Sequence, residues 1–181
     1  RRAADPAFGI DRFEDFAERL RIALRTVLVK TDHDRLGVVQ RIGLRYVDII
    51  VPREGEDHRA YLRPGLHGVA NQVFAPGTNR LHLQSVGRTS VDGLEGTLAV
   101  RIVQNDQGQA LPPDLVAAAP EFEARARPGH LVTLVDMDHY LEDSFEPDAD
   151  WVVARMYALH DQLVEVFHDQ VVTDQAIEAW R

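Results

Sequence analysis

Two arginines on one side of a predicted strand are the residues best suited to bind a ligand. In the run Arg41-Ile42-Gly43-Leu44-Arg45-Tyr46, alternation places Arg41, Gly43 and Arg45 on the same face. Planar guanidinium groups bind carboxylate or phosphate through paired hydrogen bonds. A glycine inside a strand is unfavourable unless a ligand or another backbone comes close. The run therefore predicts a site for a small anion.

A predicted hairpin supplies the other candidates for this site. Asp92-Gly93 separates two alternating runs, and a two-residue Asp-Gly loop is typical of a β-hairpin. We expect residues 79–90 and 94–104 to pair, with Gln84 opposite Arg101 and one polar face. If the arginine-bearing strand presents the same face, the ligand-binding residues are Arg41, Arg45, His82, Gln84 and Arg101.

The same arginines also have a structural interpretation. The formal net charge is -9, and the predicted helices carry acidic residues that could pair with the arginines, Glu14, Glu18 and Glu165 among them. In so acidic a chain, ion pairing is the more frequent fate of an arginine. Ligand binding is the less frequent alternative, but it is the one that would give these arginines a function.

Two carboxylates further along the chain are weak candidates for a metal site. Asp136 and Asp138 share a face of a predicted strand, and Mg²⁺ or Ca²⁺ prefers oxygen ligands. Two carboxylates are few for such an ion, strand ends often collect Asp, and Asp138 could equally pair with one of the arginines. We therefore expect no metal and no other cofactor. Asp32-His33-Asp34 could orient an imidazole for general-base work, but we interpret it as a solvated connection.

The elements that must position these residues follow from the spacing of apolar residues. Asp11 and Glu14 indicate a helix start, and Asp148 and Asp150 indicate another. The predicted elements are a helix over 11–30, a strand over 36–51, a short helix within 57–74, the hairpin, a strand over 130–138 covered on both faces, a helix through about residue 168 and a short helix over 174–181. This order predicts an α+β fold: a mostly antiparallel sheet of about four strands, helices on one face and a long C-terminal helix.

Length and composition limit the remaining possibilities. The 181 residues, with 45% hydrophobic content, suit a single domain over 1–181. The acidic balance argues against nucleic acid, and no apolar run is long enough for a membrane helix. The absence of cysteine excludes disulfides, thiolate metal sites and cysteine nucleophiles, and we expect a cytoplasmic protein. Motifs of familiar enzyme classes, such as a phosphate-binding loop or His-Glu-x-x-His, are missing, which disfavours an enzyme.

Several short motifs occur in an order that resembles a known family. They are Arg-Ile-Gly-Leu-Arg-Tyr at 41–46, Leu-Pro-x-Asp-Leu at 111–115, Asp-Met-Asp at 136–138, Leu-His at 159–160, and Phe167 followed by Thr173-Asp174. From about residue 11 onward the chain resembles a sporadically distributed family of uncharacterised bacterial proteins. Members often have Asn where this chain has Asp48, and typically carry an additional N-terminal strand and helix. The resemblance implies the C-terminal portion of a longer chain and brings no activity.

Three functions remain as hypotheses. We expect a non-catalytic bacterial binding or interaction module that engages a protein partner or a small anionic ligand, because no set of nucleophile, base and oxyanion donor is evident. The alternative is an enzyme whose phosphate- or carboxylate-bearing substrate is anchored by Arg41, Arg45 and Arg101. A third hypothesis is a homodimer formed through the C-terminal helix, Trp151 and Trp180.

Overall fold

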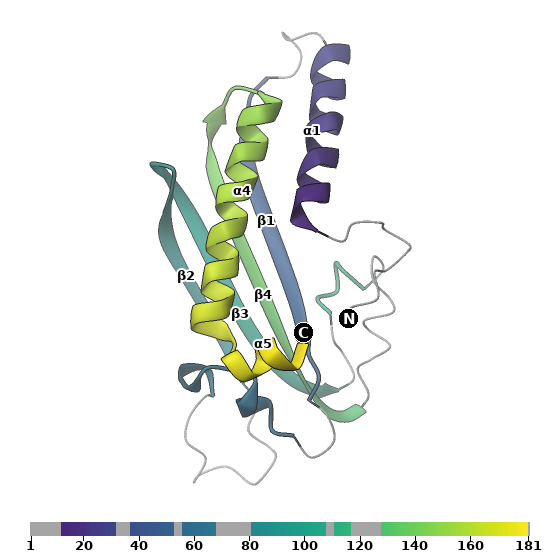
Figure 1. Ribbon diagram of the computed structural model, residues 1–181, viewed down its shortest axis with the longest axis vertical. Coiled ribbons are helices and arrows are strands. Elements are labelled where there is room, and N and C mark those ends of the chain that lie inside the picture. The colour runs from purple at the N-terminus through teal and green to yellow at the C-terminus, as the bar shows by residue number, and fades with distance from the viewer. Residues whose placement is uncertain are drawn as a thin grey trace.

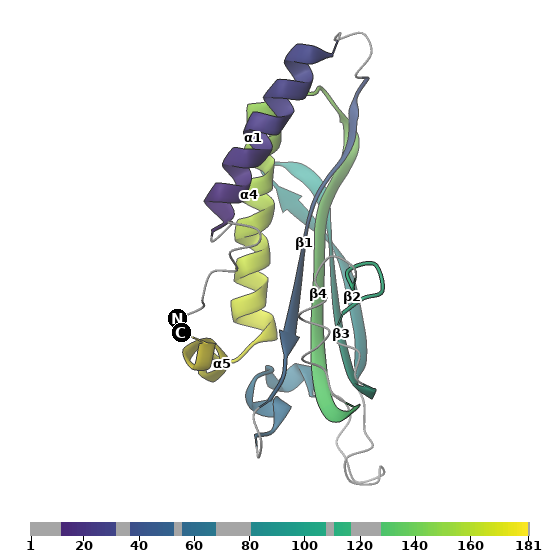
Figure 2. The ribbon, with the colours of Figure 1, turned by 90° about the vertical axis from the view of Figure 1, so that its right-hand side faces the viewer.

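The predicted α+β architecture is confirmed. The computed structural model describes residues 12–31, 37–52, 56–67, 81–107, 111–116 and 128–180. Within these ranges a four-stranded antiparallel sheet has the order β1-β4-β3-β2 (Figure 1). Helices α1, α4 and α5 lie on one side of the sheet (Figure 2). The strands are β1 Val39–Ile50, β2 His82–Val91, β3 Leu94–Gln107 and β4 Pro128–Phe145.

The helices differ from their predicted limits mainly at the ends. α1 spans Phe13–Lys30, α4 spans Ala149–Val166 and continues as a π-helical turn, η3, over Phe167–Val171, and α5 spans Asp174–Trp180. The expected cap Asp11 lies outside the described residues. Asp148 caps α4, because its carboxylate accepts from the Trp151 backbone N–H at 2.6 Å. A short helix was expected within 57–74. The described part of that range, up to His67, contains two 3-10 turns, η1 His58–Ala60 and η2 Pro64–Leu66.

The hairpin forms with the predicted register. Val91 pairs with Leu94 and Gln84 pairs with Arg101. Asp92 and Gly93 have φ values of 48° and 82°, the positive values that a type I′ turn requires. The α4 helix fixes the hairpin from one side, because Gln162 donates to the Ser90 carbonyl at 2.8 Å and Arg155 pairs with Asp92. The turn chemistry of two residues therefore sets which hairpin side chains face the helices.

The prediction for β4 was wrong in two respects. The strand was expected to end at Asp138, but it continues to Phe145. It was also expected to be covered on both faces, whereas the helices lie on one (Figure 2). Apolar residues on both faces of the strand suggested burial on each side, and Asp136 and Asp138 suggested the chemistry of a strand end. The two carboxylates instead lie on the face away from the helices, where arginines of neighbouring strands neutralise them.

The core lies between the sheet and α4. Its fully buried members include Ile102 and Met137 from the sheet and Leu159 and Leu163 from α4. α1 joins this layer through His160 of α4. The imidazole stacks on Phe13 with ring centroids 4.0 Å apart, and its Nδ1 lies 2.5 Å from the Tyr46 hydroxyl. Burial lowers the pKa of His160 and raises the pKa of Tyr46 to about 12. One side chain therefore links α1, α4 and β1.

A buried histidine reaches across the middle of the sheet. His139 of β4 is 0% exposed, and its Nε2 lies 2.8 Å from the Thr89 hydroxyl of β2. Gly96 of β3 lies between them, because a Cβ there would be only 2.6 Å from the Thr89 Oγ1. Burial lowers the pKa of His139, with a smaller opposing effect from the Leu159 backbone. The imidazole is therefore held in its neutral form.

The lowered histidine pKa values predict a loss of stability in mild acid. An unfolded histidine binds a proton near pH 6.5, whereas folded His139 and His160 do so only at lower pH. The unfolded state then holds more protons, so the free energy of unfolding should fall below about pH 6.5, by up to about 1.4 kcal/mol per pH unit for each histidine. Urea unfolding followed from neutral pH to about pH 5 measures this slope, since carboxylates titrate mainly below about pH 5.

The control for this acid effect is His139→Leu, which removes the titrating group and keeps an apolar filling. We expect the variant to show a shallower acid slope than the original protein. An unchanged slope would show that His139 does not contribute.

Candidate functional site

The strand register places all five predicted ligand residues on the face away from the helices, which we call the open face. Cross-strand partners share a face, and Gln84, Arg101, Asp136 and Val47 form one row across β2, β3, β4 and β1. Arg45 lies in the next row, opposite Asp138. His82, Arg41 and Gly43 follow by alternation along their strands. The two arginines of β1 and the polar side of the hairpin therefore do meet on one surface.

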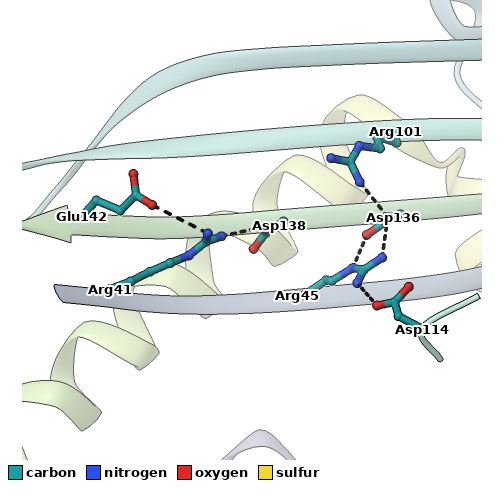
Figure 3. A network of polar contacts seen from close by, with 7 residues as sticks. All are labelled: Arg41, Arg45, Arg101, Asp114, Asp136, Asp138 and Glu142. Carbon is teal, nitrogen blue, oxygen red and sulfur yellow. Dashed lines mark hydrogen bonds and ion pairs between the residues drawn. The ribbon is translucent and has the colours of Figure 1, made fainter. Parts of the chain in front are cut away.

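Asp136 is the centre of this surface. Its carboxylate accepts from Arg45 Nε at 2.7 Å and from Arg45 Nη2 at 2.9 Å, which is a bidentate pair (Figure 3). Arg101 Nη1 approaches the same carboxylate at 3.5 Å. The Asp136 side chain is only 6% exposed, whereas that of Arg101 is 47% exposed. A buried carboxylate thus holds two guanidinium groups side by side on an otherwise accessible face.

Asp114 completes the coordination of Arg45 and was missed as a site residue. It lies in the segment 111–116, and its Oδ2 accepts from Arg45 Nη1 at 2.7 Å (Figure 3). The hydrogen bond to Arg45 lowers the pKa of Asp114. The pKa of Arg45 is raised, chiefly by its bond to Asp136. In sequence Asp114 was only part of the Leu-Pro-x-Asp-Leu motif, and nothing local indicates that it contacts a strand 69 residues away.

Arg41 belongs to a separate group on the same face. Its Nη2 donates to Asp138 at 2.9 Å, and its Nη1 lies 3.7 Å from Glu142 (Figure 3). The guanidinium lies over the Tyr140 ring at 3.9 Å from the centroid. Gly43 is directly opposite Tyr140, and a Cβ there would approach the Tyr140 Cβ to 3.1 Å. The close approach that Gly43 allows is therefore made by this arginine and tyrosine, and no ligand is needed to explain it.

His82 and Gln84 lie at the margin of the site. Gln84 is opposite Arg101 and His82 is opposite Val103, and both are exposed. Within the described ranges neither side chain bonds to the arginines. Of the five predicted residues, the structure brings Arg45 and Arg101 together around Asp136 and leaves the other three outside that contact.

The charges around Asp136 do not cancel until Asp114 is counted. Arg45 and Arg101 carry two positive charges against one negative charge on Asp136, which leaves one positive charge. Asp114 supplies the balancing carboxylate from a different segment. Around Arg41 the balance is reversed, because one guanidinium faces two carboxylates. Displacement of Asp114 would therefore leave a positive charge for an external anion at Arg45 and Arg101, whereas Arg41 already faces an excess of negative charge.

The structural interpretation of the arginines was correct in kind, and the expected alternative that Asp138 pairs with an arginine is confirmed, but the helical acids that it named are not the partners. Arg41 and Arg45 do form ion pairs, with acids of β4 and of segment 111–116. Glu14, Glu18 and Glu165 are on helices across the sheet, and Glu18 pairs with Arg21 of its own helix. The helices cover the opposite face, so their acids are out of reach.

Both weak candidates for metal binding, Asp136 and Asp138, form ion pairs with arginines. Asp136 and Asp138 share a face as expected, and each accepts a hydrogen bond from a guanidinium. His139 is on the opposite, buried face of β4. Among the described residues, no group of three or more His, Cys, Asp or Glu side chains is arranged to hold a metal ion. The Asp32-His33-Asp34 run lies outside the described residues.

The tryptophans proposed for a dimer contact are used within the chain. Trp151 packs on Phe145 with ring centroids 4.9 Å apart, and Trp180 stacks on Tyr61 at 6.1 Å. Trp180 is still 40% exposed. The dimer remains a hypothesis, and both rings already have intramolecular partners.

Comparison with protein-family models, curated proteins and solved structures finds no match to this chain. The family resemblance therefore stays a prediction. Three of the motifs that carry it meet at the site, because they contain Arg45, Asp114 and Asp136. No helix in the described part of the chain is long and apolar enough to cross a membrane.

Proposed function

We propose that this protein is a non-catalytic interaction module whose open face binds an acidic side chain of a protein partner at Arg45 and Arg101. The observation that carries the proposal is the pair of guanidinium groups beside buried Asp136, whose second positive charge is balanced only by the exposed carboxylate of Asp114. Arg101 is half exposed, and within the described residues its ion pair is the 3.5 Å contact with Asp136, which leaves its other donors available there to a carboxylate. Arg45 is fixed in place by its bidentate pair with Asp136.

Apolar side chains around the arginines favour a protein partner over a free small anion. Val47 is in the same row as Asp136, and Val103 and Ile49 are in the row beside it. These three are half-buried, and Val86, one row away on the other side, is 58% exposed. An arginine surrounded by apolar surface is typical of protein interfaces, where such residues contribute much of the binding energy.

The same geometry favours binding over catalysis. Asp136 and Asp138 are the sheet carboxylates beside these arginines, and both accept hydrogen bonds from guanidinium groups. Those bonds occupy oxygen lone pairs that a general base would use. The enzyme alternative also relied on Arg41 as an anchor, and Arg41 faces two carboxylates of its own. We keep a bacterial, cytoplasmic setting as part of the proposal.

Arg101→Gln tests the proposal against the matched control Arg88→Gln. Both arginines are on the open face of the hairpin and both changes remove one positive charge, but Arg88 pairs with Glu95 at its margin. With acetylated, amidated hexaglutamate as the probe, we expect Arg101→Gln to weaken binding about tenfold, because a hydrogen bond to a charged group contributes roughly 1.5–3 kcal/mol. Arg88→Gln should change the dissociation constant less than about twofold. Titration of the ¹⁵N-labelled protein, followed by amide chemical shifts, measures both.

The net charge of -9 makes this titration selective, because the protein as a whole repels an acidic peptide. Shifts confined to β1, β3 and β4 around Asp136 support the proposal. Equal weakening by both variants overturns the proposal, and so does the absence of any shift both in the original protein and in Asp114→Ala. If inorganic phosphate binds at this position and hexaglutamate does not, the ligand is a small anion and the protein-partner proposal is wrong.

A further inference from the structure

We infer that Asp114 is an intramolecular competitor that occupies the position of the partner's carboxylate, so that a partner binds by displacing it from Arg45. The inference rests on the proposed function and adds the regulation of the same site. It also defines the ligand: one carboxylate, presented at Arg45 Nη1 and within reach of Arg101.

The geometry separates a fixed receptor from a replaceable ligand. Asp136 accepts hydrogen bonds from Nε and Nη2 of Arg45, and Nη1 of the same guanidinium donates to Asp114. Asp136 and Arg45 belong to adjacent strands and are joined by a two-point contact with a nearly buried carboxylate. Asp114 comes from outside the sheet, makes a one-point contact, and has a side chain that is 59% exposed. The first pair is part of the sheet, whereas the second is a surface contact.

The local structure of segment 111–116 holds Asp114 close to Arg45. Leu111 is 5% exposed and anchors one end of the segment. Pro112 and Pro113 follow, and the Leu115 N–H donates to the Pro112 carbonyl at 2.9 Å to close a turn around Asp114. Proline restricts the backbone before docking, so less conformational entropy is lost when the carboxylate binds. The carboxylate is therefore held near Arg45 even though its own ion pair is exposed.

Competition of this kind sets the minimum binding affinity that an external ligand needs in order to displace Asp114. An exposed ion pair is weak, so a second carboxylate can replace Asp114. A tethered group nevertheless competes at an effective concentration of the order of millimolar. A carboxylate with no other contacts therefore binds poorly, and a partner gains by also covering apolar neighbours such as Val47 and Val103. The arrangement favours an acidic side chain on a protein surface over a free anion.

Asp114→Ala compared with Glu142→Ala tests the inference. Both changes remove one exposed carboxylate from the neighbourhood of an open-face arginine, and they alter the net charge equally. Only the first frees Arg45. In the same hexaglutamate titration we expect Asp114→Ala to bind about three- to tenfold more tightly than the original protein, and Glu142→Ala to differ from it by less than about twofold. Adding Arg101→Gln to Asp114→Ala should remove the gain.

The outcomes separate the inference from the proposed function. If the original protein binds hexaglutamate and Asp114→Ala binds no more tightly, the competitor role is wrong and the proposed function stands. An equal gain in Glu142→Ala would assign the effect to net charge and would also overturn the competitor role. If only Asp114→Ala binds, both are supported, and if neither protein binds, both are wrong. Thermal unfolding of each variant verifies that the sheet is intact.

Discussion

Replacing Arg45 with methionine is expected to lower the free energy of unfolding by about 3 kcal/mol. Arg45 supplies both short hydrogen bonds to Asp136, whose side chain is 6% exposed. Without Arg45 the carboxylate would remain buried with only the 3.5 Å contact from Arg101. Breaking a buried ion pair from one side is costly because the other charge loses its compensation. Equilibrium unfolding in urea measures the loss.

Arg41→Met is the matched control for this prediction. The residue is on the same strand and face, but its side chain is 48% exposed and its partner Asp138 is 31% exposed. We expect it to lose only about 1 kcal/mol, for an exposed ion pair and a stacking contact with Tyr140. Arg45→Met combined with Asp136→Leu should recover much of the loss, since removing both charges leaves none uncompensated.

The outcome at Arg45 also decides where binding can be tested. If Arg45→Met destabilises the fold as expected, lost binding in that variant would not distinguish a ligand contact from a structural one. Arg101 is the informative position, because its removal leaves Asp136 paired with Arg45. If Arg45→Met were as stable as the original protein and failed to bind, Arg45 would be a ligand contact with no structural role.

Gly96→Ala is expected to destabilise the protein by a similar amount, about 3 kcal/mol. A Cβ at this position would lie 2.6 Å from Thr89 Oγ1, 3.2 Å from Val91 Cγ2 and 3.3 Å from Leu141 Cδ2. Thr89 would have to move away and lose its contact with His139, which is fully buried. Overpacking and an unsatisfied buried imidazole each contribute, and the urea midpoint of unfolding measures their combined effect.

Gly87→Ala provides the control for Gly96→Ala. Gly87 is in the neighbouring strand β2, and a Cβ there would meet no atom within 4 Å. Alanine in an open strand position is expected to be neutral or stabilising by up to about 1 kcal/mol. Thr89→Ala added to Gly96→Ala should relieve the closest clash and leave the lost hydrogen bond and the tight contacts with Val91 and Leu141. Equal stability of the two single glycine variants would show that Gly96 is not required for the contact between Thr89 and His139.

The two faces of the sheet separate two kinds of polar group. On the helix side, Thr89 and His139 form a buried contact that Gly96 makes room for. On the open side, Arg45 and Arg101 face Asp136, and the charge of this group is balanced only when Asp114 is docked. The first arrangement requires exclusion of water, and the second is accessible to a partner. This difference is why we assign binding to the open face.

Sequence alone determined the features that depend on neighbouring residues. The pleat places Arg41, Gly43 and Arg45 together, and the Asp92-Gly93 turn sets the hairpin register, so Gln84 and Arg101 were correctly paired. The α+β class followed from the order of helical and alternating segments. These signals are local, because backbone geometry converts spacing along the chain directly into direction in space.

Only the tertiary structure decided what each charge contacts. Arg45 and Asp136 are 91 residues apart, and Asp114 comes from a third segment. No local pattern specifies that β1 pairs with β4, so the arginines were assigned to helical acids, and pairing of Asp138 with an arginine was only an alternative to a strand end. Once β1 and β4 are adjacent, the carboxylates become cross-strand partners of the arginines and β4 continues to Phe145. Hydrophobic burial on the helix side fixes that pairing, and the charges on the other side must then accommodate it.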